Sequence, residues 1–190
     1  MLTKEQIELI NEKVSIFKPC VAFANKFLVL PPIQIAFNDC PSEMFRTMDN
    51  AAESHIASNG IGCVCFNAPW FAERILEHQD DVEFFLFHEL RHIHQLNQIN
   101  MLVANKRTRE PKEIVQLWKN DFENYQRNEG GESQLANVTQ EVEVDANAYG
   151  ILLEILYRNG RSPLLSLPEE AINPANKRLQ RYYDTLPEFR

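Results

Sequence analysis

The stretch "FFLFHELRHIHQ", residues 84–95, places three histidines and a glutamate in an otherwise apolar run. A histidine is buried at low cost only when its ring nitrogens have partners, so several in one apolar run require a common explanation. If the run is helical, His88 and His92 lie on one face, about 40° apart around the axis, whereas His94 lies about 200° from His92 and is expected to be structural. We expect a metal ion bound between the rings of His88 and His92.

Residues 88–92 form the pattern HExxH, whose two histidines can bind one zinc ion. Glu89 is displaced from them by one residue, which suits a general base that reaches a water molecule rather than the metal itself. The alternative is a pair of surface histidines on an ordinary helix. Because Phe84, Phe85 and Leu96 share the histidine face and are expected to bury it, that alternative is disfavoured.

A catalytic zinc site needs a third protein ligand and an open position. The segment "QEVEVDANAYG", residues 140–150, supplies acidic candidates. In a helix, Glu141 and Asp145 share the face that continues into apolar residues, whereas Glu143 lies on a polar stripe that we expect to face solvent. A carboxylate directed into a core is costly unless it binds a cation. Glu141 is therefore the predicted third ligand.

The order of these two motifs resembles the gluzincin group of zinc metallopeptidases, in which a glutamate on a downstream helix completes the site. The phrase "EVEVDANAYG", residues 141–150, is similar to the ExxxD segment of CAAX-type and heat-shock-type membrane metalloproteases. It is also similar to the acidic segment of the soluble ImmA/IrrE-type peptidases, and the length of the chain favours the soluble kind. The resemblance covers residues 61–96 and 135–155.

From the two motifs and the resemblance we predict a zinc metallopeptidase. It is expected to hydrolyse a peptide bond in an intracellular protein or peptide substrate. Glu89 is expected to act as the general base. Asp145 is expected to hold the free ring nitrogen of one histidine and so to fix its tautomer. The predicted ligands of Zn²⁺ are His88, His92 and Glu141.

Hydrolysis of a peptide bond also needs a donor for the oxyanion, and Tyr149 and His55 are the candidates. In the resembling peptidases the strand before the active helix pairs with the substrate backbone, which would give residues 61–66 that role. Cys63 and Cys65 fall on one face of this strand and are expected to be packing residues rather than metal ligands.

Hydrophobic periodicity predicts a mostly helical α+β fold with a small sheet of two to four strands next to the HExxH helix. The resemblance implies that this fold is zincin-like. Strands are expected at residues 33–37 and 61–66, with mostly loop at 38–60. A capping box of Asp80 and Glu83 is expected to open the HExxH helix. Further helices are predicted at about 3–17, 20–30, 69–78, from Pro111 to about 125, 135–158 and 174–184.

The chain has 190 residues, of which 44% are hydrophobic, as expected for a single domain spanning 1–190. Within it, residues 97–134 are expected to form a helical insertion and residues 160–190 a C-terminal tail. The net charge of −8 disfavours a nucleic-acid partner. No export signal or membrane span is predicted, so we expect a cytoplasmic protein with reduced cysteines.

Two alternatives remain open at this stage. One is a latent or non-catalytic module that uses the same fold for binding, with the tail "DTLPEFR", residues 184–190, lying in its own cleft. The other is a zincin-type toxin or defence effector with the same chemistry and another target. The sequence does not indicate the oligomeric state.

Overall fold

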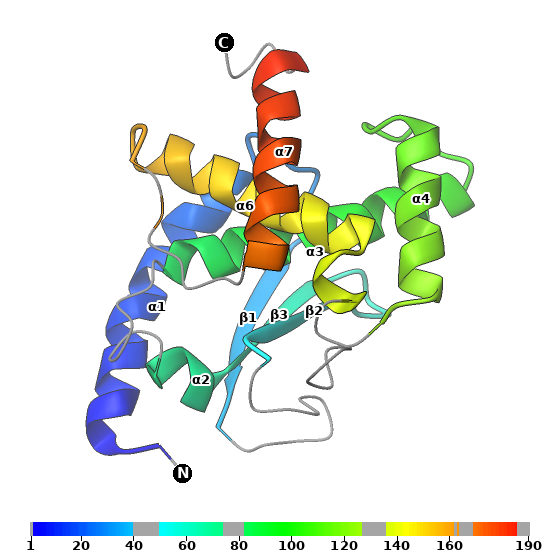
Figure 1. Cartoon of the computed structure of the whole chain (residues 1–190). Helices are drawn as coiled ribbons and strands as arrows, with labels where there is room; N and C mark the ends of the chain where they lie inside the picture. The colour runs from blue at the N-terminus through cyan, green and yellow to red at the C-terminus, as the bar shows by residue number, and fades with distance from the viewer. Residues whose placement is uncertain are drawn as a thin grey trace.

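The computed structural model shows a mostly helical molecule with a small three-stranded sheet packed against one long helix (Figure 1). This confirms the predicted α+β class. The described residues are 2–39, 50–73, 82–126, 136–161, 163 and 169–185. The helices are α1 Lys4–Ala24, α2 Ala68–Glu73, α3 Val82–Val103, α4 Lys112–Glu123, α6 Glu141–Tyr157 and α7 Glu169–Thr185, and the strands are β1 Ile33–Asn38, β2 Ala52–Ile56 and β3 Gly62–Asn67.

Helix α1 has Thr3 as its N-cap. The Thr3 side chain accepts a hydrogen bond from the Gln6 backbone N–H, and the Gln6 side chain accepts one from the Thr3 backbone N–H. This capping box satisfies two donors that the first turn leaves without helical partners. The helix then continues through Pro19 to Ala24. The prediction of two separate pieces, ending and restarting near residue 18, is therefore wrong.

The sheet has the order β1-β3-β2, with β1 parallel and β2 antiparallel to β3. Strand β2 was not predicted, because residues 38–60 were expected to be mostly loop. Its sequence, "AESHI", lacks a clear alternation of apolar and polar residues. As the central strand, β3 has both edges paired, so the expectation that residues 61–66 also pair with a substrate strand is wrong.

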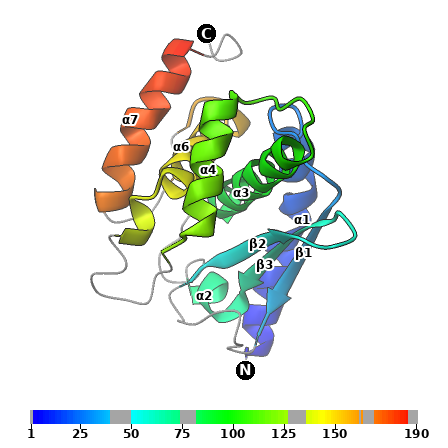
Figure 2. The same cartoon turned by 90° about the vertical axis from the view of Figure 1, so that its right-hand side faces the viewer.

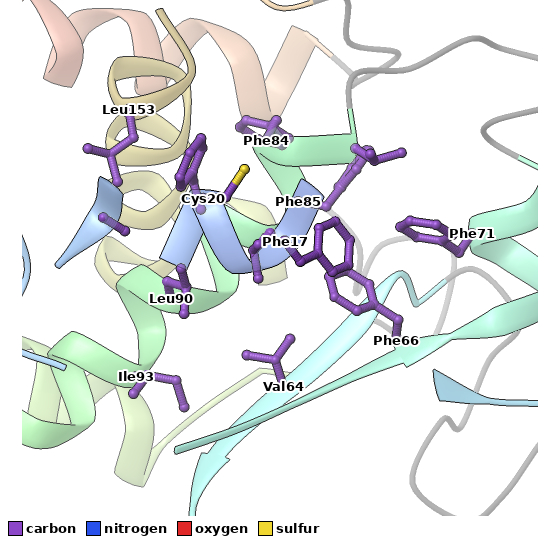
Figure 3. Close-up of a cluster of buried hydrophobic side chains, with 14 of the residues drawn as sticks. Phe17, Cys20, Val64, Phe66, Phe71, Phe84, Phe85, Leu90, Ile93 and Leu153 are labelled. Carbon is purple, nitrogen blue, oxygen red and sulfur yellow. The ribbon is translucent and has the colours of Figure 1, made fainter. Parts of the chain in front are cut away.

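The main core lies where α1, the sheet, α2 and α3 meet (Figure 3). Side chains on the inner face of β3, Val64 and Phe66, point toward α1 and α3, while Cys63 and Cys65 alternate to the outer face. Aromatic rings from four elements lie with their centroids between 5.2 and 6.2 Å apart, in Phe17, Phe37, Phe66 and Phe71.

Helix α6 is buried from its second residue, Val142, to Glu154. Helix α3 covers one side of it and α7 crosses another side, as the two views of the molecule show (Figures 1 and 2). Because every residue of this stretch is buried, the difference between apolar and polar positions does not reveal which face of α6 points to α3. None of the described helices is long and apolar enough to span a lipid bilayer.

Close contact between α3 and α6 leaves little room for a side chain at position 150. A Cβ at this position would lie 3.0 Å from the Phe84 ring and 3.3 Å from the His88 backbone nitrogen. Gly150 lies seven residues after Glu143 and therefore on nearly the same face of α6. The face that carries Glu143 is consequently directed at the HExxH helix.

Gly150→Val should reduce the free energy of unfolding by about 1–3 kcal/mol, because the added methyl groups must displace Phe84 or separate the two helices. Gly150→Ala adds a single carbon and gains about 1 kcal/mol of helix propensity, so it should be close to neutral. Chemical denaturation of the two variants measures both effects. A valine variant as stable as the parent would show that the two helices can separate freely.

Candidate metal centre

Two histidines from α3 and one glutamate from α6 form a compact group of ligating atoms. In His88, His92 and Glu143 these atoms all lie within 4.8 Å of one another. The two histidine Nε2 atoms are 3.1 Å apart, and each lies 3.4 Å from a different carboxylate oxygen of Glu143. Two imidazoles and one carboxylate are a donor set that binds zinc in proteins, so the group could hold a metal ion.

The third member of the group is Glu143, not Glu141. Glu141 is the first residue of α6, its side chain is 50% exposed, and it forms an ion pair with Arg178 of α7. The expectation that Glu141 points inward and Glu143 outward is wrong. The polar stripe of α6 faces α3, where histidines and other polar groups meet it, and the assumption that a polar face is a solvent face fails here.

Electrostatics within the group favour a cation. Burial alone would raise the pKa of Glu143, but the charges and hydrogen bonds of His92 and His88 hold it well below its ordinary value. Burial alone would lower the pKa of His92, but Glu143, Glu89 and Gln95 raise it to about 9. Thus a buried carboxylate is stabilised by positive charge at this place, and a divalent ion would supply such charge.

Glu89 lies beside this group without belonging to it. The residue is buried, and its negative charge acts on both His92 and Tyr125. Its displacement by one position from His88 gives it a direction different from that of the histidines. The position is compatible with the predicted general base, a role that remains a prediction.

The tautomer of His92 is fixed by a glutamine rather than directly by Asp145. The Gln95 amide nitrogen donates to Asp145 Oδ2 at 2.7 Å and to the Val142 carbonyl at 3.1 Å. The Gln95 carbonyl oxygen is then left to accept the proton of His92 Nδ1, at 2.8 Å. In the neutral ring, Nε2 of His92 therefore presents its lone pair to the metal position. The predicted direct contact of Asp145 with a histidine is wrong, although Asp145 is connected to His92 through Gln95.

His88 lacks such a partner. Its Nδ1 atom is buried and has no hydrogen bond within the part of the chain that the structure describes. Zinc-binding histidines usually donate this second N–H to an acceptor. Of the two rings, only His92 shows that arrangement.

Asp145 is held by a buried ion pair. Arg91 donates to Oδ2 through Nε at 2.8 Å and to Oδ1 through Nη2 at 3.3 Å, while the Tyr182 hydroxyl of α7 donates to Oδ1. Burial opposes the charge on Asp145, but Arg91 outweighs it and lowers the pKa of the carboxyl group. Arg91 also binds Glu110 at 3.1 Å and lies 4.1 Å from the ring centre of Tyr149.

The remaining predicted residues lie outside the group of three. Tyr149 is packed between Arg91 and Tyr182, and His55 is exposed on β2, opposite Cys63 on the outer face of the sheet. The structure brings neither to the candidate metal ligands, and their role as oxyanion donors remains a prediction. The third histidine of the quoted stretch, His94, is fully buried and accepts a hydrogen bond from the Val29 backbone at 2.9 Å.

Sequence reasoning missed a tyrosine that contacts the group. The hydroxyl of Tyr125 donates a hydrogen bond to Glu143 Oε1. Burial and the charge of Glu143 raise the pKa of this hydroxyl well above its usual range. Tyr125 follows Trp118 and Phe122 at the spacing of an apolar helix face, so no signal in the sequence distinguishes it.

The chain has no match among protein-family models, among curated proteins or among solved structures. The predicted membership in the gluzincin group therefore rests on the motif and on this site. What the structure supports is a buried group of two HExxH histidines and a glutamate in a helical α+β fold.

Glu143→Ala should weaken zinc binding by orders of magnitude, since it leaves two histidines and a gap where the third ligand stood. Glu141→Ala is the matched control on the same helix. It removes only a half-exposed ion pair and should change the free energy of unfolding by about 0.5 kcal/mol or less, with zinc affinity unchanged. Titration of each metal-free variant with zinc measures the affinities. Loss of zinc in the Glu141 variant alone would contradict the observed direction of α6.

Asp145→Asn should lower zinc affinity about 10- to 100-fold, because it weakens the group that orients Gln95 and, through it, His92. It also breaks a buried ion pair and should destabilise the fold. Glu110→Gln controls for that second effect, since Glu110 binds Arg91 but not Gln95. Equal zinc affinities in the two variants would limit Asp145 to a role in stability.

Proposed function

We propose that this chain is a metal-dependent peptidase that uses zinc bound by His88, His92 and Glu143 to hydrolyse a peptide bond. One observation carries the proposal: the two HExxH histidines of α3 and a glutamate of α6 place their ligating atoms within 4.8 Å of one another, and Glu89 is buried beside them. The donor set fits zinc better than calcium or magnesium, which prefer oxygen ligands alone.

When bound, zinc supplies a Lewis acid and lowers the pKa of a bound water toward neutrality. The protein's own part is proton transfer and orientation. Glu89 takes a proton from the attacking water and later gives it to the amine that leaves. Gln95 and Asp145 hold the imidazole of His92 in one tautomer throughout, because a ring that rotates would withdraw Nε2 from the metal position.

The free edge of β2 supports a protein or peptide as the substrate. The Asn67 N–H bonds Ala51 at 2.9 Å, and the Ala57 N–H bonds Ile61 at 2.8 Å, so alternate residues of β2 turn their backbone groups toward β3. The intervening groups then face outward, and no strand within the described ranges pairs with them. An extended peptide can add to such an edge. The outward backbone groups are those of Ala52, Ser54 and Ile56.

This edge also lies on a suitable side of the sheet. Of the three strands, β2 packs most extensively against α3, the helix that carries both histidines. Its outward backbone groups would hold a substrate strand antiparallel or parallel to β2, next to the HExxH helix rather than on the far side of the sheet. The proposed binding strand is therefore β2 in place of residues 61–66.

Glu89→Gln should retain zinc and the fold but abolish cleavage, because an amide occupies the same space and cannot accept a proton. The measurement compares newly formed protein N-termini in cells that produce the parent chain or the variant, alongside metal analysis of both purified proteins. Glu113→Gln, an exposed residue on α4, is the control for the change of charge.

Cleavage products that persist in the Glu89→Gln variant would remove this residue as the base. A parent chain that takes up zinc but produces no new N-termini would favour a latent or purely binding role. A purified parent chain without metal, and without uptake on addition of zinc, would end the proposal.

A further inference from the structure

Tyr125 lies two residues beyond the end of α4, next to the start of α6, and contacts the metal-binding group through Glu143. Its hydroxyl oxygen accepts a hydrogen bond from Asn137 Nδ2 at 3.1 Å and donates its own proton to Glu143 Oε1. The one proton of the hydroxyl is thus directed at the carboxylate by a second, independent contact. This arrangement fixes the hydroxyl with respect to a single oxygen of Glu143.

The segment around this tyrosine is attached to the start of α6 by several further hydrogen bonds. The side chain of Gln140, the N-cap residue of α6, makes no capping hydrogen bond. Instead, the Asp121 carboxylate of α4 accepts a hydrogen bond from the Val142 backbone N–H at 3.2 Å and so caps α6. The backbone N–H of Gln126 donates to the Gln140 side chain at 2.8 Å, and that side chain donates back to the Gln126 carbonyl at 3.0 Å. Asn137 also donates to this carbonyl, at 2.9 Å.

Ring contacts bring the same segment over the histidines. Phe122 stacks on Tyr125 with 6.2 Å between ring centres and an interplanar angle of 19°, and it meets His92 edge-on at 6.0 Å. Figure 2 shows α4 standing beside α3, on the side away from α1. Within the stretch expected to be a helical insertion, Phe122 and Tyr125 therefore form one wall of the candidate metal centre.

We propose that Tyr125 is a positioning residue for the metal: its hydroxyl engages Oε1 of Glu143 and holds the carboxylate in one orientation toward the Nε2 atoms of His88 and His92. This inference rests on the proposed metal centre. A carboxylate whose oxygen accepts a hydrogen bond from a fixed hydroxyl turns less freely. Glu143 therefore keeps the orientation in which each of its oxygens lies 3.4 Å from a histidine Nε2 atom.

The test compares Tyr125→Phe with the parent chain in zinc affinity, measured by competition with a chromophoric chelator, and in the visible absorption of the Co²⁺-substituted protein. Tyr125→Phe should weaken zinc binding about 10- to 100-fold. It should also change the cobalt spectrum, which reports the number and geometry of the ligands. Tyr157→Phe is the matched control. It removes a hydroxyl that bonds Cys20 near the other end of α6 and should leave both measurements unchanged.

A second variant separates the hydroxyl from its surroundings. Gln140→Ala removes the side chain that binds Gln126 but keeps the hydroxyl of Tyr125 and its contact with Asn137, so its cobalt spectrum should stay close to that of the parent. Identical spectra and affinities in Tyr125→Phe and the parent would overturn the proposal. So would the same spectral change in Gln140→Ala, which would assign the effect to the segment as a whole. A parent chain that binds neither zinc nor cobalt overturns the metal centre itself, and the role of Tyr125 with it.

Discussion

The structure depends on one contact, the packing of α3 against α6 through faces that are partly polar. Polar groups at such an interface are costly unless each one finds a partner. Here Gln95 links His92 to Asp145, Arg91 neutralises Asp145, and Glu143 meets the two histidines. The same contacts that satisfy the buried groups also gather three ligating side chains, so stability and the candidate site have a common origin.

Much of α3 could be predicted because its information is local. Two histidines four residues apart lie on one face of any helix, and the apolar residues around them require burial on nearly all sides. The α+β class followed in the same way from periodicity. Strand β2 was not predicted, because polar residues occur on both of its faces. Glu53 and His55 lie on the outer face and Ser54 lies on the inner face, so "AESHI" shows no apolar alternation.

The third ligand could not be predicted, because its position depends on what surrounds α6. A helix with one solvent face shows that face by its polar residues, but α6 has α3 on one side and α7 on another. Glu143 and Asn147 look like surface residues in the sequence but are buried, and Glu143 contacts the histidines of α3. Gln95 and Tyr125 could not be predicted for the same reason. Gln95 is oriented by Asp145 and Tyr125 contacts Glu143, and both partners lie far away in the sequence. Such contacts have no periodic signal.

The position of helix α7 in the sequence affects the order in which the contacts of Asp145 can form. The contact of α7 with α6 includes the ion pair of Arg178 with Glu141 and the hydrogen bond of the Tyr182 hydroxyl to Asp145. During synthesis on the ribosome, α7 emerges after all three candidate ligands and after Asp145. Until α7 docks, Asp145 therefore has Arg91 and Gln95 but not the Tyr182 hydroxyl among its donors.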